Sequence, residues 1–347
     1  MSPHGRLAFL DGIRGVAIAL VVAVHAVSYV GLSLPSSSGR YSVIFALAVP
    51  PFFTVDGFLF CHRMAKRSPV SHGAYLTSSA QRLLLPWLVF SVLYLVLRGT
   101  FESITPSAER IVLGQSPGGL LMQLYTSAAA PQLYFLPSLF LIRALAPLSL
   151  ALFRAHICIL LFLLGVYTAM FGEYLQAAYL DLFRISGLDP VLHALWGMQY
   201  YLLGITLFRV WSHIERHPLA VSTGFVLLAP LFLAHPSLKI LFQFALIAGL
   251  FSLMWVASHR VCFLSRVGRH TMGIYLVHAP VPIKLFQLVS DHVVTAGIAF
   301  PFVWTCSLLT SLFLAVSIGN TRFGRFILGL PRSSHRPAAP HTATDTH

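Results

Sequence analysis

Residues 7–30 read LAFLDGIRGVAIALVVAVHAVSYV, a run apolar enough to cross a membrane that nevertheless carries Asp11, Arg14 and His25. In an α-helix each residue turns by about 100°, so the step from Arg14 to His25 amounts to about three turns plus 20°. Both side chains therefore lie on one face, about 16 Å apart along the axis, with Asp11 near the same face. Because ionisable groups within a span usually face a protein interior or a wet cavity, we predict a functional site here. The alternative is a snorkelling arginine and a hydrogen-bonded core histidine.

The composition predicts an integral membrane protein. The chain has 347 residues, of which 57% are hydrophobic and only 10% are charged, whereas soluble domains carry roughly 25% charged residues. We expect an all-α, polytopic fold with about ten transmembrane helices. The net charge of +13 is spread over loops, which argues against a nucleic-acid partner. The four cysteines show no paired spacing, so we expect neither a disulfide framework nor a metal site.

Hydropathy predicts the positions of ten helices and of one short, partly embedded helix at 118–128. We expect residues 1–320 to form the membrane domain and residues 321–347 to form a basic, disordered cytoplasmic tail. The ten predicted spans are 8–30, 42–62, 83–98, 132–153, 157–172, 191–208, 218–234, 238–257, 271–289 and 293–318.

The distribution of basic residues predicts the orientation. With the N-terminus in the cytoplasm, most of the 23 Lys and Arg residues fall in cytoplasmic segments, as the positive-inside rule requires. Both termini are then cytoplasmic, and we expect the protein in the cell (inner or plasma) membrane. Arg14 lies in the inner third of the bilayer and His25 in the outer third.

Two further charged residues fall inside predicted spans. Asp56, in PPFFTVDGFLF (50–60), lies at a depth close to that of Arg14. A buried carboxylate needs a partner, and Arg14 and Arg82 are the candidates from depth. Arg143 lies too deep to snorkel easily, so we expect it to line the cavity or to pair with Asp56 or a carbonyl. A purely structural ion pair between the first two helices is the alternative for Asp56.

Six stretches, taken in order over about residues 6–320, resemble the acyltransferase family 3 membrane proteins. The signature of that family is Arg or His, ten residues, and then His, which here are Arg14 and His25. The similar stretches are LDGIRGVAIALVVAVH, PPFFTVDGFLF, QRLLLPWLVF, LYFLPSLFL, YYLLGITLF and VGRHTMGIYLVHAP. The chain departs from the family in having Asp56 where Ser is frequent, and in having no acidic residue in the fourth predicted helix.

The resemblance implies acyl transfer from cytoplasmic acyl-CoA, commonly acetyl-CoA, to a hydroxyl of a carbohydrate or glycolipid-type acceptor, such as in polysaccharide O-acetylation. Acyl-CoA is then a co-substrate, and we expect no bound cofactor. The sequence shows no cluster of His and Asp with metal-ligand spacing, so we expect no metal. We expect Arg14 to orient the donor and His25 to act either as general base or as acyl carrier. The expected substrate-binding residues are Arg82, Asp56, Arg143, Tyr275 and His278.

A non-enzymatic transporter or permease is the alternative function. In that case Arg14, His25, Asp56 and Arg143 would line a transport path. Transporters often contain inverted repeats with broken helices in matching positions. No such internal self-similarity is visible in the sequence, which favours the acyltransferase hypothesis.

Overall fold

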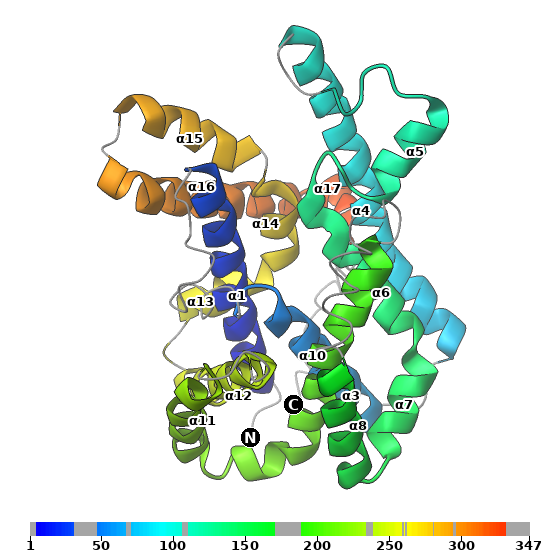
Figure 1. Cartoon of the computed structure of the whole chain (residues 1–347), viewed down its shortest axis with the longest axis vertical. Helices are drawn as coiled ribbons and strands as arrows, with labels where there is room; N and C mark the ends of the chain where they lie inside the picture. Colours follow the sequence, from blue (N-terminus) through cyan, green and yellow to red (C-terminus); the bar gives the residue numbers. More distant parts are fainter. Residues whose placement is uncertain are drawn as a thin grey trace, which may run out of the picture.

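The computed structural model is built from helices throughout the residues that it describes (Figure 1). These residues are 5–30, 47–66, 71–105, 110–170, 189–233, 239–258, 260, 262–279, 281–293 and 296–330. The helices are α1 (Gly5–Tyr29), α3 (Pro50–Lys66), α4 (His72–Ile104), α5 (Pro117–Tyr125), η1 (Pro131–Tyr134), α6 (Phe135–Ala144), α7 (Ala146–Arg154), α8 (Ile157–Met170), α10 (Asp189–Ile214), α11 (Pro218–Leu233), α12 (Lys239–Ala257), α13 (Cys262–Arg269), α14 (Thr271–Val277), α15 (Val281–Val293), α16 (Ala296–Asn320) and α17 (Arg322–Ile327).

The all-α, polytopic membrane fold expected from the sequence is confirmed. Within the described residues, five helices are long and apolar enough to cross a membrane, namely α1, α4, α10, α12 and α16. Two bent helix pairs are also apolar enough, η1/α6 with α7 (59°) and α14 with α15 (58°), and the number is up to seven if each pair is one span. The predicted number of ten stays a prediction.

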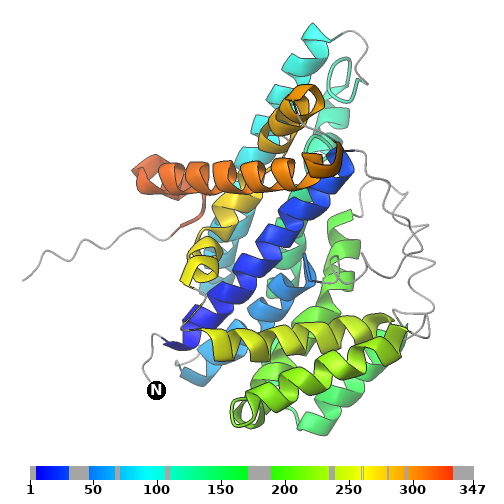
Figure 2. The same ribbon diagram turned by 90° about the vertical axis from the view of Figure 1, so that its left-hand side faces the viewer.

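Helix α1 lies in the middle of the molecule and links its two halves (Figure 1). On one side α1 packs against α3, which packs extensively against α10; α10 contacts α6, and α6 contacts α4. On the other side α1 contacts α12 and α13 and, nearer its C-terminus, α14, α15 and α16. In Figure 2, α16 crosses near the C-terminal end of α1, whereas α11 and α12 lie near its N-terminal end.

An aromatic cluster fixes the N-terminal half of α1 against its neighbours. The ring of Phe9 stacks on Trp211 of α10 at a centroid distance of 5.1 Å, and it meets Phe58 of α3 edge-on at 6.0 Å. Trp255 of α12 approaches Phe9 at 5.2 Å. Such large buried rings supply much apolar contact area together with a preferred geometry. The cluster therefore sets the register of α1 against α3, and so the position of Arg14 relative to the α3 charges.

Close packing of α3 and α10 depends on glycines that let the two backbones touch. A Cβ atom on Gly204 would collide with the carbonyl oxygen of Thr54, and one on Gly57 would collide with that of Tyr201. Neither backbone atom can move without separating the helices.

We expect Gly204→Ala to prevent stable folding, because it would force α10 away from α3. Gly165→Ala in α8 is the matched control, since a Cβ there meets no heavy atom within 4 Å. Removing a helical glycine at an open site should stabilise the helix by about 0.5–1 kcal/mol. Yield and thermal unfolding of the two variants in detergent test this, and equal stability of both variants would contradict the close packing.

Several helix boundaries differ from the predicted ones. Helix α4 begins at His72, behind an N-cap formed by Ser71, whereas the sequence predicted its start at 83. The predicted span 132–153 is interrupted at Leu145, and the predicted span 271–289 is interrupted after Val277. Prolines explain both interruptions, because a proline lacks the N–H that an uninterrupted helix needs.

Two short helices occupy segments that the sequence predicted as loop or tail. Helix α13 lies between the predicted spans 238–257 and 271–289, and α17 lies at the start of the predicted tail 321–347. Several segments lie outside the described residues: 331–347, the segments 31–41 and 173–188 between predicted spans, and the start of the predicted second span (42–46).

Candidate functional site

A buried ion pair joins α3 to α6. The Arg143 guanidinium donates to both carboxylate oxygens of Asp56, with an Nε–Oδ2 distance of 2.9 Å and a second bond from Nη2 to Oδ1. The side chains are only 13% and 5% exposed. This geometry is the bidentate arrangement in which Arg–carboxylate pairs are strongest. Asp56 thus pairs with Arg143, which was one of the options predicted for Arg143, and not with Arg14 or Arg82, the partners predicted from the depth of Asp56.

Three arginines lie close enough to act on this carboxylate, and Arg82 lies close to two of them. We call these four the arginine cluster: Arg14 (α1), Arg63 (α3), Arg82 (α4) and Arg143 (α6). The charges of Arg143, Arg63 and Arg14 all act on Asp56, and those of Arg143 and Arg63 also reach Arg82. Since Asp56 is already neutralised by Arg143, the cluster keeps an excess of positive charge. It is therefore suited to an anionic ligand.

The members of the arginine cluster differ in how far they are already paired. Arg14 forms an ion pair with Asp11, one turn earlier in α1, at 3.2 Å. Among the described residues, neither Arg63 nor Arg82 forms an ion pair, and Arg82 is exposed. Arg63 and Arg82 are thus the guanidinium groups most available to phosphate, a group that the forked donors of arginine match well.

An apolar cleft opens beside the arginine cluster. It has a volume of about 270 Å³. Its wall includes Tyr75, over whose ring the Arg63 guanidinium lies at 5.9 Å. The cleft therefore offers an apolar surface next to positive charge. Its lining residues are Phe60, Met64, His72, Tyr75, Ala146, Pro147 and Leu150.

A second polar centre lies on the C-terminal half of α1. The half-buried His25 ring lies 5.2 Å, centroid to centroid, from the ring of His278, which is fully buried at the end of α14. His278 Nδ1 lies 2.8 Å from the carbonyl oxygen of Tyr275 and 3.2 Å from that of Ile274. Its Nε2 is buried and has no hydrogen-bond partner within the described part of the chain.

Side chains from other elements hold the end of α14 in place. The Tyr94 hydroxyl of α4 donates to the carbonyl oxygen of Leu276 at 2.6 Å, and Gln132 Nε2 of η1 donates to that of Ala279 at 2.8 Å. In return, the Tyr275 hydroxyl donates to the carbonyl oxygen of Gln132. Carbonyl groups freed by a helix break at membrane depth must be satisfied by protein. This network does so, and it gives the His278 ring a defined position.

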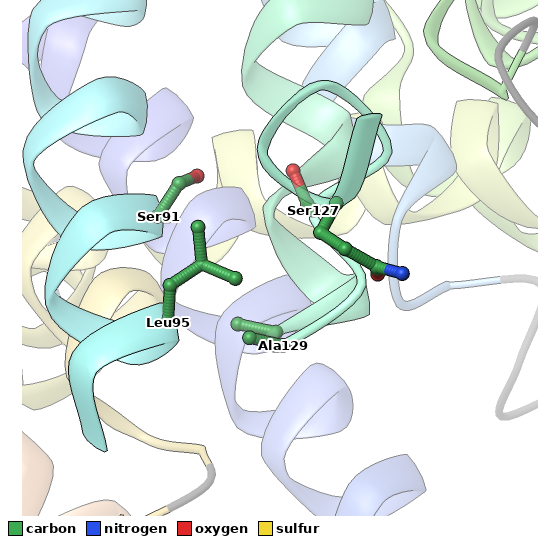
Figure 3. Close-up of a pocket in the computed structure, with 6 residues that line it drawn as sticks. Ser91, Leu95, Ser127 and Ala129 are labelled. Carbon is green, nitrogen blue, oxygen red and sulfur yellow. The ribbon is translucent and has the colours of Figure 1, made fainter. Parts of the chain in front are cut away.

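A separate crevice lies between α4 and the segment that follows α5 (Figure 3). Ser91 and Ser127 face this space, and the Ser127 hydroxyl also accepts a hydrogen bond from Trp87 Nε1 at 2.9 Å. No lining residue carries a titratable group, so the crevice does not provide acid–base chemistry. Its lining residues are Ser91, Leu95, Gln123, Ser127, Ala129 and Ala130.

The structure thus gathers the predicted site residues into two groups. Arg14, Arg82, Asp56 and Arg143 meet near the N-terminal half of α1, whereas His25, Tyr275 and His278 meet near its C-terminal half. Because α1 is one continuous helix from Gly5 to Tyr29, the separation of about 16 Å between Arg14 and His25 holds.

Two residues of these centres were not among the predicted site residues. Arg63 could have been found from its position seven residues after Asp56, which puts both side chains on one face of α3. Gln132 carries no comparable signal, because its role depends on the tertiary contact of η1 with the break after α14.

The described residues contain no group of three or more His, Cys, Asp or Glu that could hold a metal ion.

The apolar helices together with a polar site on α1 define a polytopic membrane protein. A family model described as an acyltransferase domain matches residues 7–320. The chain therefore belongs to acyltransferase family 3, and it is a multi-pass membrane acyltransferase. No curated protein matches the chain, and no solved structure matches it.

Proposed function

We propose that this acyltransferase transfers an acyl group, specifically acetyl, from cytoplasmic acyl-CoA to a hydroxyl of a carbohydrate or glycolipid-type acceptor in the cell membrane. The observation that carries the proposal is the placement of two polar centres along one helix. The arginine cluster lies at the end of α1 for which we propose a cytoplasmic location, and His25 lies about 16 Å further along the helix.

The arginine cluster is proposed to bind the phosphate groups of the donor. Arg63 and Arg82 form no ion pair within the described residues, so they can meet the incoming anion. Arg14, which forms an ion pair with Asp11, is the member of the cluster that lies on the same helix as His25. The pantetheine arm of CoA is long and thin, and in this proposal it follows α1 from the cluster to His25. The apolar cleft beside Arg63 offers room for the uncharged parts of the donor.

At His25 the acceptor hydroxyl is proposed to lose its proton to the imidazole while its oxygen attacks the thioester carbonyl. The carbon–sulfur bond then breaks, and the CoA thiolate takes a proton back from the imidazolium. Histidine suits this task because its ordinary pKa lies near working pH, and such catalysis contributes typically 10²–10⁴-fold. An acyl-imidazole intermediate on His25 is the second route that the same geometry supports.

The experiment uses radiolabelled acetyl-CoA and inside-out membrane vesicles from cells that express the protein. CoA does not cross the bilayer, so label should enter the carbohydrate or glycolipid fraction in inside-out vesicles and not in right-side-out vesicles. Vesicles without the protein measure the background. The fraction that takes up label identifies the class of acceptor.

Three outcomes would change the proposal. Transfer only in right-side-out vesicles would reverse the proposed orientation, including the cytoplasmic position of both termini. Transfer from a longer acyl-CoA but not from acetyl-CoA would correct the acyl group. Label in a fraction that contains neither carbohydrate nor glycolipid would refute the proposed acceptor class.

A further inference from the structure

His278 combines three features that an ordinary core histidine does not have together. Its ring is fully buried, one of its nitrogens is left without a partner, and the ring of His25 lies against it at 5.2 Å. A buried polar atom without a hydrogen bond costs about 1–3 kcal/mol, so such an atom calls for a functional explanation.

The hydrogen bonds of His278 fix which nitrogen carries its proton. Nδ1 lies 2.8 Å from the Tyr275 carbonyl oxygen and 3.2 Å from the Ile274 carbonyl oxygen. A carbonyl oxygen can only accept, so Nδ1 must be the donor. In the neutral ring Nε2 is then an unprotonated acceptor.

Neighbouring residues hold His278, and with it the acceptor Nε2, in a fixed position. The hydrogen bonds from Tyr94 and Gln132 hold the backbone on both sides of His278. His25, in contrast, forms no hydrogen bond within the described residues, and the torsion that turns its ring is soft. At a centroid distance of 5.2 Å, two ring nitrogens turned toward each other along the line between the rings would lie about 3 Å apart, a hydrogen-bond length. The His25 ring can therefore turn a ring N–H toward the acceptor.

We propose that His278 is a positioning residue for His25: its Nε2 accepts a hydrogen bond from one ring N–H of His25 and so selects the His25 tautomer. The other His25 nitrogen is then unprotonated and free to take the proton of the acceptor hydroxyl, while the N–H toward His278 stays in place. The nitrogen that remains basic in a histidine is set by the hydrogen bond that the other nitrogen makes. This inference rests on the proposed function, in which His25 is the base.

Two substitutions separate this role from a structural one. His278→Gln keeps a hydrogen-bond acceptor near the position of Nε2, whereas His278→Asn keeps a donor near the position of Nδ1 and removes that acceptor. The two variants are assayed in inside-out vesicles with radiolabelled acetyl-CoA, at matched protein abundance, with the membrane's own glycans and lipids as acceptors. We expect His278→Asn to lower the maximal rate by about 10–100-fold with an unchanged KM for acetyl-CoA, and His278→Gln to retain most of the rate.

The opposite pattern would overturn the proposal. If His278→Asn is as active as the wild type while His278→Gln is inactive, the bond from Nδ1 to the backbone is what matters, and His278 only completes the end of α14. A raised KM for acetyl-CoA in His278→Asn would instead mean that His278 acts on the donor.

A second measurement does not depend on activity. Nitrogen-15 spectra of the full-length protein labelled at histidine report the tautomer of each ring, and the His25 signals are those missing from His25→Ala. We expect one His25 tautomer in the wild type and in His278→Gln, and exchange between tautomers in His278→Asn. Identical His25 signals in all three would refute the pairing. Failure of the wild type to transfer label would refute the proposed function alone, and these spectra would still decide the role of His278.

Discussion

Alanine in place of His25 is expected to lower acyl transfer by about 10²–10⁴-fold, the usual contribution of a general base. The imidazole is half-buried, and the hydrogen bonds that hold the end of α14 come from Tyr94 and Gln132 and not from His25. The fold should therefore survive, and the loss should appear in the rate rather than in the abundance of the protein. The vesicle assay with radiolabelled acetyl-CoA measures this loss directly.

A matched control is the substitution His213→Ala. His213 is also a histidine on a long helix, but it is exposed near the end of α10 and belongs to neither polar centre. We expect His213→Ala to transfer label as well as the wild type does. Equal transfer by His25→Ala and His213→Ala would mean that His25 is a packing residue, and the proposed mechanism would be wrong.

The fold was predictable where a helix is both apolar and uninterrupted. Helices α11 and α12 begin and end within one residue of their predicted bounds, because hydropathy changes sharply at both ends. The broken spans were not predicted, since the apolar composition continues through Leu145 and through Ala279. The prolines that follow in the sequence, Pro147 and Pro280, carried the signal, because a proline has no N–H to donate to the carbonyl oxygen four residues earlier.

The relative positions of the site residues were predictable only for residues on the same helix. The shared face of Arg14 and His25 follows from the helical period. The depth of Asp56 predicted Arg14 or Arg82 as its partner, which is wrong, whereas the pairing with Asp56 was one of the options expected for Arg143. The contact between His25 and His278 had no such basis. It depends on where α14 ends and on how it meets α1, and no periodicity along the chain contains that information.

The Asp56–Arg143 pair should contribute more to stability than to donor binding. Two parallel hydrogen bonds join the two groups, and both side chains are nearly excluded from solvent. Removal of one partner from a buried pair typically costs about 3–5 kcal/mol, because the remaining charge is left uncompensated. We therefore expect Asp56→Asn and Arg143→Met each to lower the unfolding temperature of the purified protein markedly.

The double variant Asp56→Leu/Arg143→Met should recover most of the lost stability, because apolar residues of similar volume often replace a buried ion pair without penalty. Coupling of this kind is what a double-mutant cycle measures.

Arg82→Gln is the control variant that should affect donor binding and not stability, since Arg82 is exposed and forms no ion pair within the described residues. It should raise the KM for acetyl-CoA while leaving the unfolding temperature unchanged. If the double variant stays as unstable as the single ones, the pair is not a self-contained structural unit. If Arg82→Gln leaves the KM for acetyl-CoA unaltered, the donor does not use Arg82.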